Sequence, residues 1–184
     1  MAAVPAAKDK EATTGLIAVF TGNGKGKTTA ALGLAFRALG HGQRVCIIQF
    51  IKGSWQYGEL EAARMFKPLL DFHVMGRGFT WKSDDLEKDK AAAREAWQFT
   101  VQTIRDNKHE LVILDELTYL AHYQIINEED MLAVLREKPA AMHIAITGRH
   151  ASAALIELAD LVTEMREIKH PFHNGIKAQK GMEF

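Results

Sequence analysis

The 184-residue sequence contains a single cysteine, Cys46, and so has no material for an intrachain disulfide or a cluster of thiolate metal ligands. It has no excess of either charge, because 23 lysines and arginines balance 23 aspartates and glutamates. No overall field recruits nucleic acid or an anionic membrane, and we expect neither as a partner. No apolar stretch approaches the length that spans a bilayer, and no secretory signal pattern occurs. These absences favour a cytoplasmic protein.

The composition that remains is that of one globular domain, with 47% hydrophobic and 25% charged residues. Residues 1–14 mix small and charged side chains and show no convincing buried face, so we expect a flexible N-terminal arm. A lid that orders over a bound ligand is the functional alternative for this arm. Residues 15–184 are expected to form a single domain, with Cys46 as a small core residue.

Short apolar runs alternate with helical patterns along this domain. The predicted strands are residues 16–20, 45–51, 72–75, 111–114, 143–146 and 161–165. The predicted helices are residues 27–40, 57–66, 84–107, 128–137 and 151–159. This alternation indicates an α/β fold in which helices flank a mainly parallel sheet. Ligands of such sheets collect beyond the carboxyl ends of the strands, so residues just after each run are the first site candidates.

The first apolar run leads into a glycine-rich loop, Thr21-Gly-Asn-Gly-Lys-Gly-Lys-Thr-Thr29, and then into an alanine-rich helical pattern. Glycines let successive backbone N–H groups turn toward one anion at the start of a helix, which is how phosphate is bound. The candidate contacts to a nucleoside triphosphate are Gly22, Asn23, Gly24, Lys25, Gly26, Lys27, Thr28 and Thr29. Lys27 supplies a mobile cation, and the Thr28 hydroxyl is a candidate ligand of phosphate-bound Mg²⁺.

Two questions about this loop stay open at the level of sequence. Thr21 stands where the usual signature has its first glycine, and if Gly22 serves instead the loop is one residue shorter. The alternative to a phosphate site is a glycine-rich helix start that binds no ligand.

A second motif is the apolar run Leu111–Leu114, which ends in two carboxylates, Asp115 and Glu116. Acids at a strand end are the expected partner of a loop that binds a magnesium nucleotide, because one can orient the metal directly or through water. The other acid could position a nucleophile or bind the metal as well. The alternative is a pair of solvated acids at a strand end.

Three further groups lie at the same expected edge of the sheet. Phe79 and Trp81 sit two residues apart in a glycine-flanked loop, where extended backbone would point both rings to one side. Such a pair suits a large flat partner, and core packing is the alternative. Arg149 follows the run 143–146 and could reach phosphate or form a surface salt bridge. His170 and His173 have only loose metal-ligand spacing, so we expect no zinc site.

Together these motifs resemble those of one family, the ATP:corrinoid adenosyltransferases that carry a phosphate loop. The resemblance runs from about Gly15 to the C-terminus and rests on TGNGKGKTTAALG, QFIKG, GFTW, LVILDELTY, ITGRH and KHPFHNGIKAQKGMEF, in that order. It implies a P-loop NTPase-like, RecA-like fold. It also implies transfer of the 5′-deoxyadenosyl group from ATP to the cobalt of a reduced corrinoid, with release of triphosphate. The nucleophile is then the cobalt, so no side-chain nucleophile is needed.

The resemblance also implies roles for particular residues. Residues 22–27 are similar to the triphosphate cradle, Thr28 and Glu116 to the Mg²⁺ contacts, and Asp115 to a supporting acid. Phe79 and Trp81 match the aromatic residues that pack against the corrinoid and displace its lower axial ligand, which eases reduction to Co(I). A reduced flavodoxin or another flavin reductant is the implied electron donor, and a homodimer the implied assembly. The segment before Gly15 is shorter than the basic N-terminal helix of some relatives.

Two other classes of protein would use the same nucleotide motifs. A motor or switch ATPase would hydrolyse ATP to drive a partner, and should carry a partner-binding extension that this chain does not show. A nucleoside kinase could stack a base on Phe79 and Trp81, which makes it the stronger rival. Products separate the three classes, because adenosyl transfer releases triphosphate whereas the other two reactions release ADP.

Overall fold

The computed structural model describes residues 14–51, 58–76 and 86–183. Its centre is a six-stranded, fully parallel sheet with the order β3-β2-β4-β5-β1-β6. The strands are β1 (Ile17–Thr21), β2 (Val45–Gln49), β3 (Leu70–Val74), β4 (Leu111–Asp115), β5 (His143–Thr147) and β6 (Leu161–Glu164). The helices are α1 (Lys27–Gly40), α2 (Gly58–Ala63), α3 (Leu86–Asp106), α4 (Thr118–His122), α5 (Glu128–Arg136) and α6 (Ala153–Leu158), with 3-10 turns η1 (Arg64–Phe66) and η2 (Pro171–Asn174).

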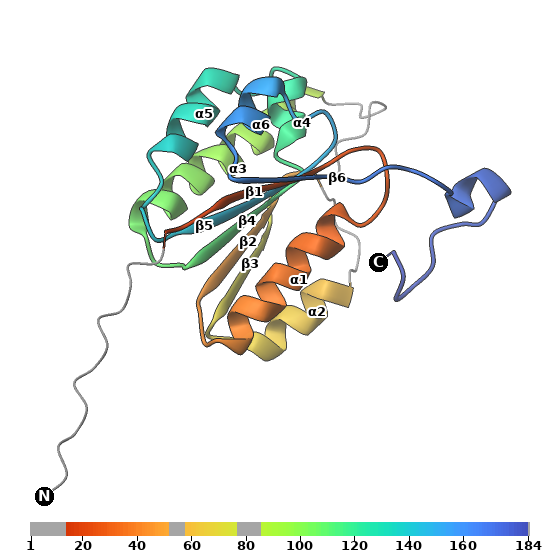
Figure 1. Cartoon of the computed structure of the whole chain (residues 1–184), viewed down its shortest axis with the longest axis horizontal. Helices are drawn as coiled ribbons and strands as arrows, with labels where there is room; N and C mark the ends of the chain where they lie inside the picture. The colour runs from red at the N-terminus through yellow and green to blue at the C-terminus, as the bar shows by residue number, and fades with distance from the viewer. Residues whose placement is uncertain (1–13, 52–57, 77–85, 184) are drawn as a thin grey trace, which may run out of the picture.

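The helices cover both faces of this sheet (Figure 1). α1 and α2 lie on one face, and α3, α4, α5 and α6 lie on the other. Side chains alternate along each strand, so the residues of β4 divide between two cores. Leu111 and Ile113 pack toward the face of α1, whereas Val112 and Leu114 pack toward the face of α3. Both faces are therefore buried, which explains why the inner strands are continuous apolar runs.

The helix α1 approaches the sheet through small side chains. Its buried residues are all alanines, Ala31, Ala35 and Ala38, spaced so that they share one face of the helix. The short side chains let the α1 backbone lie close to β1, β4 and β5. This close approach brings the first turn of α1 to the ends of the central strands.

All six predicted strands are confirmed, with ends that differ by one or two residues. β6 is one of the two edge strands of the sheet, and all four of its residues are exposed. α4 and η2 are not among the predicted helices, since each spans a single turn or little more and shows no apolar periodicity. Cys46 is buried, as predicted. The proposed arm, up to residue 13, and the aromatic pair Phe79 and Trp81 lie outside the described residues.

The topology gathers the candidate motifs at one end of the molecule. Since the strands are parallel, the loops after β1, β4 and β5 leave from the same edge. After β6 the chain runs on past this edge and turns back, so that the C-terminus lies on the side of α1 and α2 (Figure 1). Across the described ranges, none of the helices is both long enough and apolar enough to cross a membrane.

Candidate nucleotide site

The glycine loop between β1 and α1 turns at Gly22 and Gly26. Their φ angles are 93° and 107°, a left-handed region that glycine adopts without steric cost. A Cβ at Gly22 would lie 2.4 Å from the carbonyl oxygen of Met165, so no larger residue fits. Thr21 is instead the last residue of β1 and is buried. The turn thus begins at Gly22, and the loop is the shorter of the two forms that the sequence left open.

Lys27, the first residue of α1, folds back over this loop. Its Nζ donates to the carbonyl oxygens of Gly22, at 2.8 Å, and Gly24, at 2.7 Å. Partial burial lowers the pKa of Lys27 from its usual 10.5, and the nearby Arg149 cation lowers it further. The ammonium is held beside the loop by backbone carbonyls, which places a positive charge at the mouth of the cradle.

The two acids at the end of β4 occupy different positions. Asp115 is buried, and its Oδ1 accepts a hydrogen bond of 2.8 Å from the Thr28 hydroxyl. Glu116 is the next residue, but its φ of 67° turns the chain so that its side chain lines the cavity above the loop. One acid therefore contacts the phosphate loop from beneath, and the other faces the ligand space. Neither is the simple solvated acid of the alternative interpretation.

Two residues that the sequence analysis did not select hold these acids. Gln49, at the end of β2, donates from Nε2 to Asp115 Oδ2 at 3.0 Å. Thr147, at the end of β5, donates to Asp115 Oδ1 at 2.7 Å and accepts from the Glu116 N–H at 2.9 Å. The sequence did contain a signal for both residues, because each is a polar residue at or near the end of an apolar run. Comparing the ends of neighbouring strands could have identified them.

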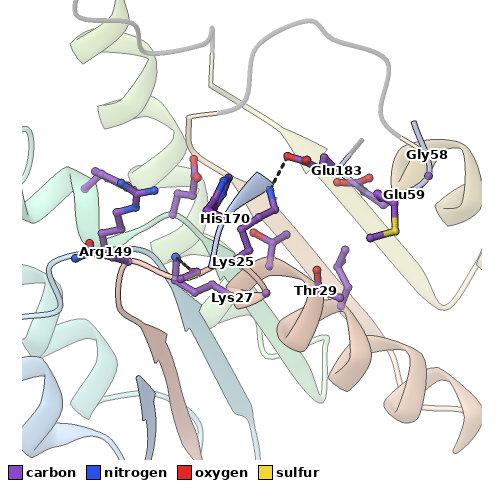
Figure 2. Close-up of a pocket in the computed structure, with 17 residues that line it drawn as sticks. Lys25, Lys27, Thr29, Gly58, Glu59, Arg149, His170 and Glu183 are labelled. Atoms are coloured by element: carbon purple, nitrogen blue, oxygen red, sulfur yellow. Dashed lines mark hydrogen bonds and ion pairs between the residues drawn. The ribbon is translucent and has the colours of Figure 1, made fainter. Parts of the chain in front are cut away.

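A cavity of about 550 Å³ joins these parts. It is lined by Asn23, Gly24, Lys25, Gly26, Lys27, Thr28, Thr29, Leu32, Gly58, Glu59, Glu116, Tyr119, Arg149, His170, Gly181, Met182 and Glu183. Figure 2 shows Lys25, Lys27 and Arg149 arranged along the loop side of this space. Of the candidate contacts predicted from the sequence, residues 23–29, Glu116 and Arg149 line this cavity together, whereas Gly22 is not part of its lining.

The C-terminal segment forms part of the cavity wall, which the sequence analysis did not predict. The Glu183 carboxylate lies 2.6 Å from the Lys25 ammonium, as Figure 2 shows. Closer to β6, the Met165 carbonyl accepts from the Gly24 N–H at 2.7 Å and ties the start of this segment to the loop. His170 lines the cavity, whereas His173 pairs with Glu167 at 2.7 Å. Of the two histidines considered from sequence, His170 is thus the one at the site.

A parallel sheet, a glycine loop entering α1 and an acid of β4 bonded to the loop threonine define a nucleotide-binding protein of the P-loop NTPase-like, RecA-like class. A solved structure agrees with this fold: the flagellar accessory protein FlaH of Methanocaldococcus jannaschii superposes with a TM-score of 0.60. The match covers 83% of this chain and 71% of that chain at 13% sequence identity, so it shows the fold alone.

Sequence comparison then gives the family. A model of the family described as ATP:corrinoid adenosyltransferase BtuR/CobO/CobP matches residues 13–184, and the chain belongs to that family. It is 46% identical over 171 residues to a corrinoid adenosyltransferase of Escherichia coli K12, covering 92% of this chain and 86% of that protein. It is 44% identical over 191 residues to a corrinoid adenosyltransferase of a Sinorhizobium species, covering 100% and 89%. The resemblance inferred from the motifs is confirmed.

Proposed function

We propose that the protein transfers the 5′-deoxyadenosyl group of ATP to the cobalt of a reduced corrinoid, in adenosylcobalamin biosynthesis and corrinoid salvage. The observation that carries this proposal, beside membership of the family, is a phosphate cradle whose cations face one cavity. The cobalt(I) electron pair forms the bond to the ribose C5′, and the electrons of the C5′–O bond leave with the intact triphosphate. Cob(I)alamin and cob(I)yrinic acid a,c-diamide are the two acceptors that the family resemblance implies.

The cradle suits a triphosphate leaving group. Negative charge grows on the triphosphate as the C5′–O bond breaks, and fixed cations stabilise that charge in proportion to their proximity. Lys27 and Arg149 both line the cavity, as Figure 2 shows. The backbone N–H groups of the loop would complete the cradle, except that of Gly24, which donates to the Met165 carbonyl. The protein then acts by orientation and charge neutralisation, with Lys27, Thr28 and Glu116 as the residues nearest the reacting triphosphate.

The donor set fits Mg²⁺ bound together with the nucleotide. Among residues 14–51, 58–76 and 86–183, no cluster of three or more histidine, cysteine or acidic side chains could hold a metal by itself. Mg²⁺ does not need one, because it keeps several waters and takes phosphate oxygens with one or two protein oxygens. The Thr28 hydroxyl and the Glu116 carboxylate would supply those oxygens, with Asp115 supporting Thr28 through their hydrogen bond. When bound, the ion supplies positive charge to the triphosphate.

Phe79 and Trp81 are proposed to pack against the corrinoid and to remove its lower axial ligand, although both lie outside the described residues. The described part of the chain before them ends at Gly76, two residues after the carboxyl end of β3. We further propose a reduced flavodoxin or another flavin reductant as the electron donor, a homodimer as the assembly and the cytoplasm as the compartment. These proposals rest on the family resemblance.

The decisive experiment combines purified protein, ATP, Mg²⁺ and chemically reduced cobalamin. We expect a light-sensitive cobalt–carbon product and release of triphosphate in equal amounts. ADP as the nucleotide product would favour the kinase or the ATPase instead. A second experiment compares Phe79→Ala and Trp81→Ala with cobalt(II) and with pre-formed cobalt(I) as the starting corrinoid. Losses of equal size in the two assays would count against the axial-ligand role.

A further inference from the structure

Three polar side chains stand side by side across the carboxyl end of the sheet. Gln49 ends β2, Asp115 ends β4 and Thr147 ends β5, and these three strands are neighbours in the sheet. Gln49 and Asp115 are register partners on β2 and β4. On β4 and β5, Leu114 pairs with Ile146, so the next residues, Asp115 and Thr147, follow side by side. The row therefore follows from the strand register itself.

The alternation of the strands points this row toward α1. Ile47, Ile113 and Ala145 each lie two positions earlier on the same strands and belong to the core beneath α1. The three polar side chains therefore continue an apolar surface, and they end at Thr28 in the first turn of α1. Gln49, Asp115 and Thr147 are each no more than 1% exposed.

Such burial is costly for polar groups unless they are hydrogen-bonded. Asp115 accepts from Thr28, Thr147 and Gln49, so the carboxylate is bonded through both oxygens. The Gln49 amide must point its NH₂ group at Asp115, because an ionised carboxylate can only accept. That orientation leaves Gln49 Oε1 buried without a hydrogen-bond partner in the part of the chain that the structure describes. The row thus holds Asp115 at a local cost in stability, which is typical of functional sites.

Thr147 is also bonded to the second acid. Its hydroxyl accepts from the Glu116 N–H while donating to Asp115, so one side chain connects both residues of the acidic pair. Glu116 has a φ of 67°, a conformation that is costly for a residue other than glycine and needs support from its surroundings. The Thr147 bond supplies that support at the backbone nitrogen of the turn. Glu116 then lines the cavity while Asp115 stays beneath the loop.

We propose that Gln49 and Thr147 are positioning residues for the magnesium nucleotide. Gln49 holds Asp115 in the orientation that accepts from Thr28, and Thr147 holds the same acid and fixes the turn that carries Glu116 into the cavity. The Thr28 hydroxyl hydrogen is then directed at Asp115, which leaves the oxygen lone pairs of Thr28 for a cation. This inference rests on the proposed function only in taking Mg-ATP as the ligand.

The test measures ATP binding by calorimetry, once with Mg²⁺ and once with a chelator, in the absence of corrinoid. Thr147→Val keeps the shape of the side chain and removes both hydrogen bonds, and Thr147→Ser restores the hydroxyl. Gln49→Met removes the amide at similar volume. The matched control is Thr100→Val, because Thr100 is an equally buried threonine whose hydroxyl donates to the Ala96 carbonyl within α3.

We expect Thr147→Val and Gln49→Met to weaken binding of Mg-ATP by about 10- to 100-fold, the effect of removing a hydrogen bond to a buried charged group. Binding of metal-free ATP should change much less, Thr147→Ser should recover most of the loss, and Thr100→Val should bind as the wild type does. If the two residues had a purely structural role, the variants would lose affinity for Mg-ATP and for metal-free ATP equally, and that result would overturn the proposal. Wild-type affinity for Mg-ATP in both variants would also overturn it. So would a wild-type protein whose affinity for ATP does not depend on Mg²⁺.

If Thr147→Val does not fold, Gln49→Met decides by the same criteria. The result is independent of the adenosyl-transfer assay. A wild-type protein that binds ATP in a Mg²⁺-dependent way but makes no cobalt–carbon product would refute the proposed function and leave the positioning roles standing.

Discussion

The hydroxyl of Thr28 donates to Asp115 Oδ1 over 2.8 Å and so joins the first turn of α1 to the end of β4, across 87 positions of sequence. The alanine face of α1 makes this contact geometrically possible, because larger side chains would hold the helix further from the sheet. The hydrogen bond therefore fixes the loop and the acid relative to each other. Binding then needs little reorganisation, which favours both affinity and alignment of the reacting atoms.

The core that carries this arrangement can be tested with a matched pair of methionines. Met131 of α5 is 1% exposed, whereas Met65 of η1 is 84% exposed. Met131→Ala removes buried apolar atoms and leaves a cavity, so we expect the free energy of unfolding to fall by about 2–5 kcal/mol. Met65→Ala should change it by less than about 0.5 kcal/mol. Urea titration measures both, and equal effects would contradict the burial seen here.

Cys46 offers a chemical test of the same core. Burial on β2, together with the smaller effect of the Asp71 charge, raises the pKa of its thiol to about 12. The reactive thiolate is therefore scarce at neutral pH, and the side chain is only 1% exposed. We expect native protein to resist iodoacetamide at about pH 8, near the ordinary cysteine pKa, and urea-unfolded protein to react fully, as read by mass spectrometry. Rapid labelling of the native protein would show that β2 is accessible.

The strands and the loop motifs were predictable because their signals are local. Each strand is a run of apolar residues, and the order of strand, glycine loop and helix places Lys27 and Thr28 without reference to any distant residue. α4 was not predictable in this way, since its five residues are too few to show a helical period.

The roles of Gln49, Thr147 and Glu183 depend on contacts that sequence spacing does not reveal. Gln49 and Thr147 meet Asp115 only because β2, β4 and β5 are neighbours in that register. Glu183 reaches Lys25 only because the chain after β6 turns back across the site. Strand order and the course of a C-terminal segment are set by packing of the whole chain, so a reading of local patterns could not supply them.

Gly22 in the loop and Gly33 within α1 are predicted to respond oppositely to alanine. Gly22 has a φ of 93°, and a Cβ there would lie 2.4 Å from the Met165 carbonyl oxygen. Gly22→Ala should therefore distort the loop and weaken ATP binding. Gly33 lies within α1 with nothing within 4 Å of its Cβ position, so Gly33→Ala should raise the free energy of unfolding by about 1 kcal/mol. Calorimetric ATP titration and urea unfolding test both, and normal ATP binding by Gly22→Ala would show that the turn is dispensable.

The lowered pKa of Lys27 predicts how ATP affinity depends on pH. The ammonium binds triphosphate, and its neutral form does not, so the affinity should fall once the pH exceeds the pKa of Lys27 in the free protein. Burial and the Arg149 cation place that pKa below the usual 10.5, so the fall should begin at a lower pH than for an ordinary lysine. Lys27→Arg keeps its charge at every pH of the assay, since the guanidinium pKa is above about 12.

The measurement is the ATP dissociation constant between about pH 8 and pH 10.5, the usual pKa of lysine. The lower limit lies above the range in which the terminal phosphate group titrates, since the pKa of such a group is about 6 in phosphorylated side chains. The affinity of each protein is normalised to its own value at the lowest pH. The wild-type affinity should decline while that of Lys27→Arg stays level. Other groups of the cavity titrate equally in both proteins, so the difference between the two curves reports Lys27 alone. Parallel curves would mean that Lys27 remains charged throughout, or that its charge does not act on the triphosphate.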